Sequence, residues 1–179
     1  MKTKSAPAYI LRLSATLFLI TALVAAALAG VNAVTAPIIE KMNIQKTQEA
    51  IEAVLPGGGE PLESFADDTG IVQAVYASDT GYAILVTPSG FNGEISMMVG
   101  IVDGKVHGIS IIRHSETPSL GAEAAATNQN GENFRGQFAG LEGVLSVGTD
   151  IDALTGATIT SRAVTEGVNA ALACAEKLG

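Results

Sequence analysis

A long apolar run dominates the first forty residues of the chain. No charged residue occurs from Leu13 to Ile39, and Leu, Ala, Val and Ile make up most of this run as far as Val34. An α-helix needs roughly 20 apolar residues to cross a bilayer, and this run exceeds that length. We therefore expect residues 1–36 to comprise a short N-terminal segment and a transmembrane helix.

Helical periodicity continues beyond the apolar run. Met42, Ile44, Ala50, Ile51 and Val54 stand in a mostly polar background, a pattern typical of a helix that leaves the membrane. The sequence Pro-Gly-Gly-Gly at residues 56–59 then ends this helix, because proline and glycine interrupt regular structure. Residues 37–60 are thus predicted to form a connecting helix and linker, and residues 61–179 a separate domain.

The domain begins with short segments that have strand character. They cover residues 71–76, 82–87, 94–102 and 106–113, and turns rich in glycine, proline and aspartate separate them. The pair Asp103-Gly104 between the last two segments is a strong hairpin signal, because a tight hairpin turn needs positive φ at both central residues. The pattern predicts an antiparallel β-meander.

Two helices are expected to cover one face of this sheet. From Ala163 to Leu178 apolar residues recur at spacings of three and four, which predicts a final amphipathic helix. Another helix is expected within residues 121–138, where Phe134 and Phe138 are i, i+4 neighbours. The expected fold class is α+β: an N-terminal transmembrane helix followed by a domain in which an antiparallel β-meander packs against helices.

The distribution of charge predicts on which side of the membrane the domain lies. Lys2, Lys4 and Arg12 precede the apolar run without any acidic residue, so the positive-inside rule places the N-terminus in the cytoplasm. We therefore expect a single-pass protein of the cytoplasmic membrane with an extracytoplasmic domain. A cleavable signal peptide with small residues at 27–29 is the alternative, but the apolar run continues through Val31 and Val34 and favours a retained helix.

The part of the chain after the apolar run is acidic. All 18 Asp and Glu residues lie at or after Glu40, together with seven of the ten Lys and Arg residues, which gives this part a formal charge of −11. Binding to a phosphate backbone requires a basic surface, so nucleic acid is not expected as a partner. Cys174 is the single cysteine, which excludes an intrachain disulfide and a four-cysteine iron–sulfur site; its place on the apolar side of the last helix predicts a buried residue.

No catalytic or metal-binding constellation is recognisable in the sequence. His107 and His114 have neither a helix-spaced partner nor a set of thiols, so no metal site is predicted. Arrangements of a Ser, Cys or His nucleophile with a base are not discernible either, and no catalytic residue is predicted. The chain is therefore not expected to catalyse a reaction by itself.

The richest chemistry lies in D-A-L-T-G-A-T-I-T-S, residues 152–161, where the last helix starts. Four hydroxyls occur within seven residues, on Thr155, Thr158, Thr160 and Ser161. Gly156 and Ala157 leave room for a ligand beside the backbone. The free N–H groups and the dipole of a helix start attract anions, so the stretch indicates a phosphate site. An ordinary helix start capped by Thr or Ser is the alternative.

The segment D-A-L-T-G-A-T resembles a family signature, D-x-x-(S/T)-G-A-T. This signature belongs to the FMN-binding domain found in the G subunit of Rnf-type electron-transport complexes and in the C subunit of Na⁺-translocating NADH:quinone reductases. The resemblance implies that Thr158 carries FMN through a phosphoester bond. It also implies that Asp152, Thr155, Gly156 and Ala157 are recognition positions, with the hydroxyls of Thr160 and Ser161 beside them.

A second element carries the same resemblance. H-S-E-T-P-S-L-G, residues 114–121, is similar to the family's H-x-E-T-P-G-L-G and implies that Glu116, Thr117, Leu120 and Gly121 belong to the flavin site. Ser119 replaces the usual glycine, a departure that matters if this glycine serves a backbone conformation. A helix start with Thr117 as N-cap and the following proline in its first turn is the alternative.

A third element extends the resemblance toward the strands. F-N-G-E-I-S-M-M-V-G-I-V-D-G-K-V, residues 91–106, is similar to the family's Y-G-G-x-I-x-x-x-V-G-I-x-x-G-K-V. Phe91 and Asn92 replace its Tyr-Gly pair. Altogether the resemblance covers about residues 70–171, and its three elements occur in the family's order.

The resemblance implies that the chain relays electrons. It would be a membrane-anchored subunit with covalent FMN in an Rnf-type ferredoxin:NAD oxidoreductase that pumps Na⁺ or H⁺. Its partners would be the other membrane subunits, the lipid bilayer and a flavin transferase for maturation. One alternative is an FMN-bearing domain that serves a different extracytoplasmic reductase or a Na⁺-translocating NADH:quinone reductase. The other is a membrane-tethered binding module without flavin.

Overall fold

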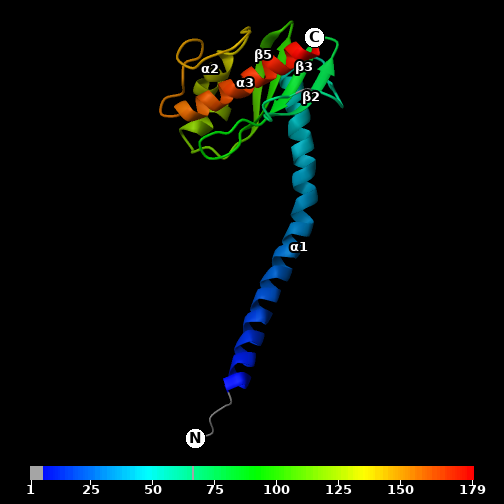
Figure 1. Ribbon diagram of the computed structural model, residues 1–179, viewed down its shortest axis with the longest axis vertical. Helices are drawn as coiled ribbons and strands as arrows, with labels where there is room; N and C mark the ends of the chain where they lie inside the picture. The colour runs from blue at the N-terminus through cyan, green and yellow to red at the C-terminus, as the bar shows by residue number, and fades with distance from the viewer. Residues whose placement is uncertain (1–5, 66) are drawn as a thin grey trace. The chain divides into compact units, whose positions relative to one another are not determined.

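The computed structural model of the protein describes residues 6–65 and 67–179, so Lys2 and Lys4 lie outside the described residues. Two compact units make up the chain, Met1–Ile44 and Gln45–Gly179. In Figure 1 the N-terminal helix runs from blue to cyan, the strands are mostly green, and the C-terminal helix is orange to red.

The N-terminal helix α1 (Ala6–Val54) is 49 residues long and contains Pro37. Its most apolar window has a mean hydropathy of 2.3, so the helix is long and apolar enough to cross a membrane, as a signal sequence would also be. The hydroxyls of Thr16, Thr21 and Thr35 donate to carbonyls of the preceding turn at 2.9–3.0 Å. These hydroxyls thus find their hydrogen-bond acceptors within the helix, which a lipid environment without water requires. The predicted continuation to Val54 is confirmed.

The second unit is built on a five-stranded antiparallel sheet whose strands follow the order of the chain. The strands are β1 (Glu60–Pro61), β2 (Val72–Ser78), β3 (Gly81–Val86), β4 (Ser96–Val102) and β5 (Lys105–Arg113). The predicted meander is confirmed, with the short β1 added at one edge. Between β4 and β5, Asp103 and Gly104 have φ values of 53° and 73°, so the predicted hairpin turn is confirmed as well.

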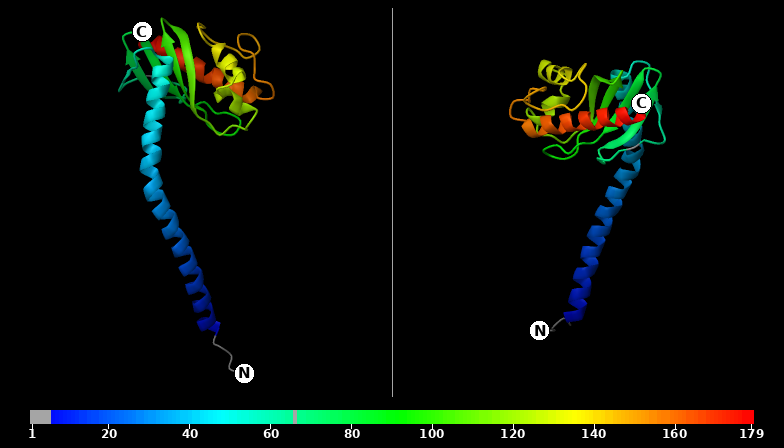
Figure 2. Two further views of the ribbon diagram at one scale, coloured as in Figure 1. Left: turned by 180° about the vertical axis from the view of Figure 1, so that it is seen from behind. Right: turned by 45° about the horizontal axis from the view of Figure 1, so that its top comes forward.

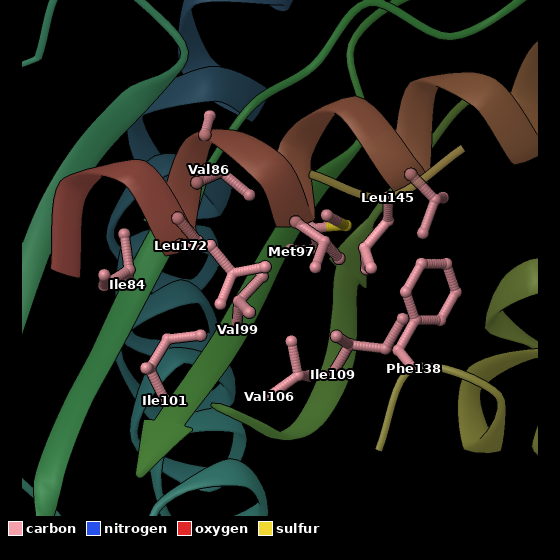
Figure 3. Packing of buried hydrophobic residues seen from close by; sticks show 14 of the residues in the cluster. Ile84, Val86, Met97, Val99, Ile101, Val106, Ile109, Phe138, Leu145 and Leu172 are labelled. Carbon is pink, nitrogen blue, oxygen red and sulfur yellow. The ribbon is translucent and has the colours of Figure 1, made fainter. Parts of the chain in front are cut away.

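The C-terminal helix α3 (Thr158–Leu178) packs along one face of the sheet, as predicted (Figure 1). Figure 3 shows side chains of the shared core, which includes Ile84, Val86, Met97, Val99, Val106, Ile109, Val164, Val168 and Leu172. A Cβ at Gly167 would lie 2.5 Å from Met97 and 2.9 Å from Pro88, so glycine lets the helix approach the sheet closely. Cys174 lies in the same core, as expected, and burial raises the pKa of its thiol.

The last turns of α1 belong to this second unit and cover the opposite face of the sheet. Ala50, Ile51, Val54 and Leu55 pack with Ala83 and Met98 in a second, smaller core. Gly100 of β4 lies against this helix end, because a Cβ there would be 1.9 Å from the carbonyl oxygen of Val54. The sequence pattern predicted helices on one face only, since no local pattern shows this long-range contact.

The helix predicted within residues 121–138 is α2 (Gln129–Gly136), and the 3₁₀ helix η1 (Gly121–Ala125) precedes it. Both lie toward the N-terminal end of α3 (Figure 2). Asn128 caps α2, because its side-chain oxygen accepts from the N–H of Gly131 at 3.0 Å. Phe138 lies just beyond the end of α2 and meets Phe134 edge-on, with ring centroids 5.6 Å apart. The predicted core contact between the two rings is therefore confirmed.

We expect Gly100→Ala to lower the free energy of unfolding by about 1–3 kcal/mol, the usual effect of overpacking a filled contact. Gly108→Ala in the neighbouring strand is the matched control, because nothing lies within 4 Å of a Cβ there. Chemical unfolding of the detergent-solubilised chain, followed by circular dichroism, measures the difference. Equal unfolding midpoints for the two variants would show that α1 does not pack against Gly100.

Candidate functional site

The D-A-L-T-G-A-T segment forms a tight turn directly before α3. The N–H of Ala157 donates to the carbonyl of Leu154 at 3.0 Å, and Gly156 between them has a φ of 73°. Glycine is favoured here because other residues are strained at such a φ. The hydroxyl of Ser161 braces the turn: it accepts from the N–H of Leu154 at 3.0 Å and donates to the carbonyl of Ala157 at 3.0 Å.

The helix α3 starts without a side-chain cap. Its N-cap residue is Ala157, whose methyl group cannot accept a hydrogen bond, so the alternative of a Ser or Thr cap is wrong. The N–H of Ser161 donates to the carbonyl of Ala157 at 2.9 Å. The N–H groups of Thr158, Ile159 and Thr160 come before this bond, where an α-helix offers no acceptor of its own. These donors and the helix dipole would favour a phosphate at this end of α3.

The structure separates the four hydroxyls that lie together in the sequence. Thr160 and Ser161 are buried, and the hydroxyl of Thr160 donates to the carboxylate of Glu116 at 2.5 Å. Thr155 and Thr158 are exposed. Thr158 lines a cavity at the start of α3, whereas Thr155 lines a neighbouring one. Burial and position therefore distinguish Thr158 from the other three.

The cavity at the start of α3 has a volume of about 360 Å³. It is lined by Phe91, Glu116, Thr117, Leu120, Gly121, Gly156, Ala157, Thr158, Ile159 and Thr160. The side chains of Phe91, Leu120 and Ile159 are 65%, 43% and 52% exposed and form an apolar rim. Small-molecule sites have volumes of roughly 300–1,000 Å³ and combine apolar walls with a few polar groups, as this cavity does. All predicted site residues except Asp152, Thr155 and Ser161 line it.

These three residues lie elsewhere. Asp152 and Thr155 line a second cavity of about 600 Å³, which also borders Leu120. The amide of Gln137 holds the backbone of Asp152: it accepts from the N–H at 2.7 Å and donates to the carbonyl at 3.2 Å. Ser161 is buried and braces the turn. A direct contact of these three residues with a cofactor stays a prediction.

Residues 117–120 form a turn before η1. The N–H groups of Leu120 and Ala122 both donate to the carbonyl of Thr117, at 3.2 Å, and the N-cap of η1 is Leu120. The alternative with Thr117 as N-cap is therefore wrong. Ser119 has a φ of 61°, in the left-handed region that favours glycine. The departure from the family pattern thus falls on a position where glycine would be unstrained.

The rim contains residues that the sequence did not mark as part of a site. Phe91 stood out only as a departure from the family pattern, and Ile159 occupies a position next to Thr158 that no motif specifies. One sequence feature could have indicated Ile159: it is apolar, yet it does not belong to the periodic apolar face of the last helix. Exposure of such a residue beside a candidate acceptor could have suggested a ligand contact.

Electrostatics at the cavity depend on backbone groups. Among the described residues that line it, none is Lys or Arg, and Glu116 is the one carboxylate. This carboxylate accepts from the hydroxyl of Thr160 and from the N–H of Asn92, the latter at 3.0 Å. A phosphate held here would therefore rely on the N–H groups at the start of α3 instead of a basic side chain.

Known proteins are similar in sequence to this chain over most of its length. Residues 90–173 match the family model of the FMN-binding domain. The chain is 38% identical to the G subunit of the Na⁺-translocating ferredoxin:NAD⁺ oxidoreductase complex of Acetobacterium woodii, with 89% of this chain and 88% of that protein covered. It is 30% identical to the G subunit of the ion-translocating oxidoreductase complex of Methanosarcina acetivorans, with 88% and 89% covered. The chain belongs to this family of G subunits.

Membership of this family confirms the resemblance stated from the sequence motifs. The chain is a member of the Rnf-type family of G subunits and contains an FMN-binding domain. The matched segment begins at Gly90, beside the rim residue Phe91, and extends through most of α3, so it contains every residue that lines the 360 Å³ cavity. A further relative, 41% identical over 54% of this chain and 57% of its own length, is the G subunit of the proton-translocating ferredoxin:NAD⁺ oxidoreductase complex of Clostridium ljungdahlii.

The residues of the cavity fit FMN in three respects. Aromatic and aliphatic side chains at the rim suit a flavin ring, which presents a large apolar face. The uncapped start of α3 suits the phosphate, since its N–H groups lack acceptors within the helix. The exposed Thr158 borders the same cavity, with its hydroxyl on the residue that opens the helix.

We expect Ser119→Gly to raise the free energy of unfolding by about 0.5–1 kcal/mol. A non-glycine residue in the left-handed region costs roughly 1–2 kcal/mol, and glycine removes this cost. The greater conformational freedom of glycine in the unfolded chain offsets part of the resulting stabilisation. Ser115→Gly is the control: Ser115 has no positive φ, so this change should lower stability by about 0.5–1 kcal/mol. Thermal unfolding measures both. A lower Tm for Ser119→Gly would show that the serine makes a compensating contact.

Proposed function

We propose that this chain is a membrane-anchored electron-transfer subunit that carries FMN on Thr158 through a phosphoester bond. One observation carries the proposal: of the four hydroxyls at the start of α3, that of Thr158 alone belongs to an exposed residue that lines the 360 Å³ cavity. Thr160 and Ser161 are buried and their hydroxyls are bonded, and Thr155 borders the neighbouring cavity.

The proposed attachment uses one FAD for each chain and a flavin transferase with Mg²⁺. The bond between Thr158 Oγ1 and the FMN phosphorus forms while the pyrophosphate bond of FAD breaks. AMP leaves with the bonding electrons, and the hydroxyl proton passes to a base of the transferase. On this chain the N–H groups at the start of α3 would bind the charged phosphate oxygens, and the apolar rim would orient the ring.

The domain would act as an electron carrier within a larger complex. Bound FMN supplies one- and two-electron chemistry, and the protein's part is to hold and orient the ring and to tune its surroundings. The partners would be the other membrane subunits of an Rnf-type ferredoxin:NAD oxidoreductase, because the similar proteins are subunits of such complexes. These subunits would deliver and remove the electrons.

The helix α1 would anchor the protein as a single span of the cytoplasmic membrane. Its length and hydropathy support this anchoring, and the basic residues before the apolar run support an N-terminus inside the cytoplasm. The FMN-binding domain would then lie on the extracytoplasmic side. A phosphoester would retain the cofactor there even where free FMN is scarce, whereas a reversible site would empty by mass action.

Thr158→Ala is expected to abolish flavin attachment. The full chain is coexpressed with a bacterial flavin transferase, and a denaturing gel is viewed under ultraviolet light. Thr149→Ala is the control, because it removes an exposed hydroxyl that lies outside the signature and lines neither cavity, and its fluorescent band should persist. A fluorescent band retained by Thr158→Ala would refute the assignment.

The same substitution tests the electron-carrier role. In the assembled complex, Thr158→Ala should abolish ferredoxin:NAD electron transfer or its coupling to ion transport while the other subunits remain assembled. Normal ion-coupled transfer without flavin on this chain would contradict the proposal. Rapid NADH oxidation by the isolated chain would instead support a reductase.

Labelling in intact cells tests the proposed topology. A thiol introduced by Asp79→Cys should react with a membrane-impermeant reagent, whereas one introduced by Thr3→Cys should not, because it lies on the cytoplasmic side. The native Cys174 is buried and serves as the background control in the unsubstituted chain. The opposite labelling pattern would reverse the orientation, and a mature N-terminus after Ala29 would reveal a cleaved signal peptide.

A further inference from the structure

The structure assigns Glu116 a role that its motif does not state: we propose that Glu116 is a positioning residue that joins two walls of the flavin cavity. One wall is the rim loop, residues 90–93, which carries Phe91. The other is the first turn of α3, which carries Thr158. The inference deepens the proposed function and rests on it, because the cavity concerned is the one proposed for FMN.

Both oxygens of the Glu116 carboxylate bind segments that are distant in sequence. Oε1 accepts from the N–H of Asn92 at 3.0 Å, and Oε2 accepts from the hydroxyl of Thr160 at 2.5 Å. The backbone N–H of Glu116 donates to Nδ1 of His114 at 3.3 Å, which helps to orient the segment that carries the carboxylate. Glu116, Asn92 and Thr160 thus form one joint between the rim loop and α3.

The carboxylate of Glu116 is buried without a cation. It is 6% exposed, and the ion pairs within residues 6–65 and 67–179 join Lys105 with Glu142 and Lys177 with Asp68. A buried charge is costly unless hydrogen bonds replace its lost hydration. Its two donors therefore stabilise the carboxylate, and because bonds to a charged group are stronger than neutral ones, they also hold the two walls firmly.

Two glycines make room for this joint. A Cβ at Gly121 would lie 2.4 Å from Oε2 of Glu116 and 2.5 Å from Oγ1 of Thr160, and a Cβ at Gly90 would lie 2.4 Å from Oε1. Neither glycine has a positive φ, so their backbone conformations would also suit other residues. At both positions the Glu116 carboxylate is the nearest group that a side chain would meet, so glycine leaves room for the joint.

Asn92 ties the rim loop to the same segment a second time. Its side-chain amide donates to the carbonyl of Ser115 at 2.7 Å, a bond that the glycine of the family pattern could not make. The exchange of Tyr-Gly for Phe-Asn therefore adds a link that the family pattern lacks. Together the two bonds of Asn92 hold Phe91 at the mouth of the cavity, although its side chain is 65% exposed.

Hydrogen exchange of the full chain without flavin tests the joint directly. In Glu116→Ala and Thr160→Val, a peptide covering residues 90–95 should exchange roughly 10-fold faster, the effect of losing a hydrogen bond to a charged group. Thr160→Ser keeps the hydroxyl and should restore slow exchange. Glu116→Gln can accept from Asn92 and donate to Thr160 through neutral bonds, so it should restore most of the protection. Exchange that is the same in all these proteins would overturn the proposal.

Coexpression of the same variants with a flavin transferase tests the consequence for FMN. Glu116→Ala and Thr160→Val should attach flavin roughly 10-fold more slowly. Iodide should also quench their attached flavin more strongly, because the rim loop no longer covers it. Asn92→Gly loses only the side-chain bond and should increase quenching to a smaller extent. If Glu116→Gln behaves like Glu116→Ala in both measurements, then flavin attachment depends on the charge of the Glu116 carboxylate and not on its hydrogen bonds. That result would refute the positioning role.

The two measurements separate this inference from the proposed function. Suppose that residues 90–95 exchange faster in Glu116→Ala but flavin is attached elsewhere than at Thr158. The joint would then be confirmed, and its role in holding FMN would be refuted. Flavin on Thr158 with unchanged exchange and quenching would leave the proposed function standing and refute the joint. If circular dichroism shows that Glu116→Ala is unfolded, the pair Thr160→Val and Thr160→Ser decides, because valine keeps the side-chain volume and serine keeps the hydroxyl.

Discussion

The packing of α3 against the sheet is the constraint on which the rest of the site depends. The missing side-chain cap at Ala157 costs an α-helix about 1 kcal/mol. Burial of a single Val or Leu side chain contributes about 1.5–3 kcal/mol, and α3 buries Val164, Val168 and Leu172. The helix can therefore begin with unpaired N–H groups and remain stable. Gly167 sets how closely α3 approaches Met97, and this approach also fixes where the first turn of the helix lies.

Local patterns could predict α3 because it packs one side against the sheet, which produces the three- and four-residue spacing of its apolar residues. The strands could be predicted from their β-branched and apolar residues and from the turn residues that separate them. The packing of the last turns of α1 on the opposite face of the sheet could not be predicted in this way. Val54 lies against Gly100, yet the sequence shows only a glycine within a strand and the end of a helix far from it. Contacts of this kind depend on the assembled sheet and leave no periodic signal.

The hydroxyls at the start of α3 show how far a sequence can define a site. Thr158, Thr160 and Ser161 fall within one helical turn, and the docking of the helix decides which of them is buried. It buries Thr160 and Ser161 and leaves Thr158 exposed. The family motif had indicated Thr158, and docking supplies a physical reason for the same choice. Phe91 and Ile159 reach the cavity only through folding, and the sequence could not place them there.

The openness of the cavity bears on how a cofactor could be kept in it. Phe91, Leu120 and Ile159 are between 43% and 65% exposed, so a flavin ring against them would remain partly accessible. Incomplete burial weakens reversible binding, and a reversible ligand leaves when its free concentration falls below Kd. A phosphoester to Thr158 would remove this dependence on concentration. The same openness would then be useful, because a carrier has to present the edge of its flavin to the partner that delivers or removes electrons.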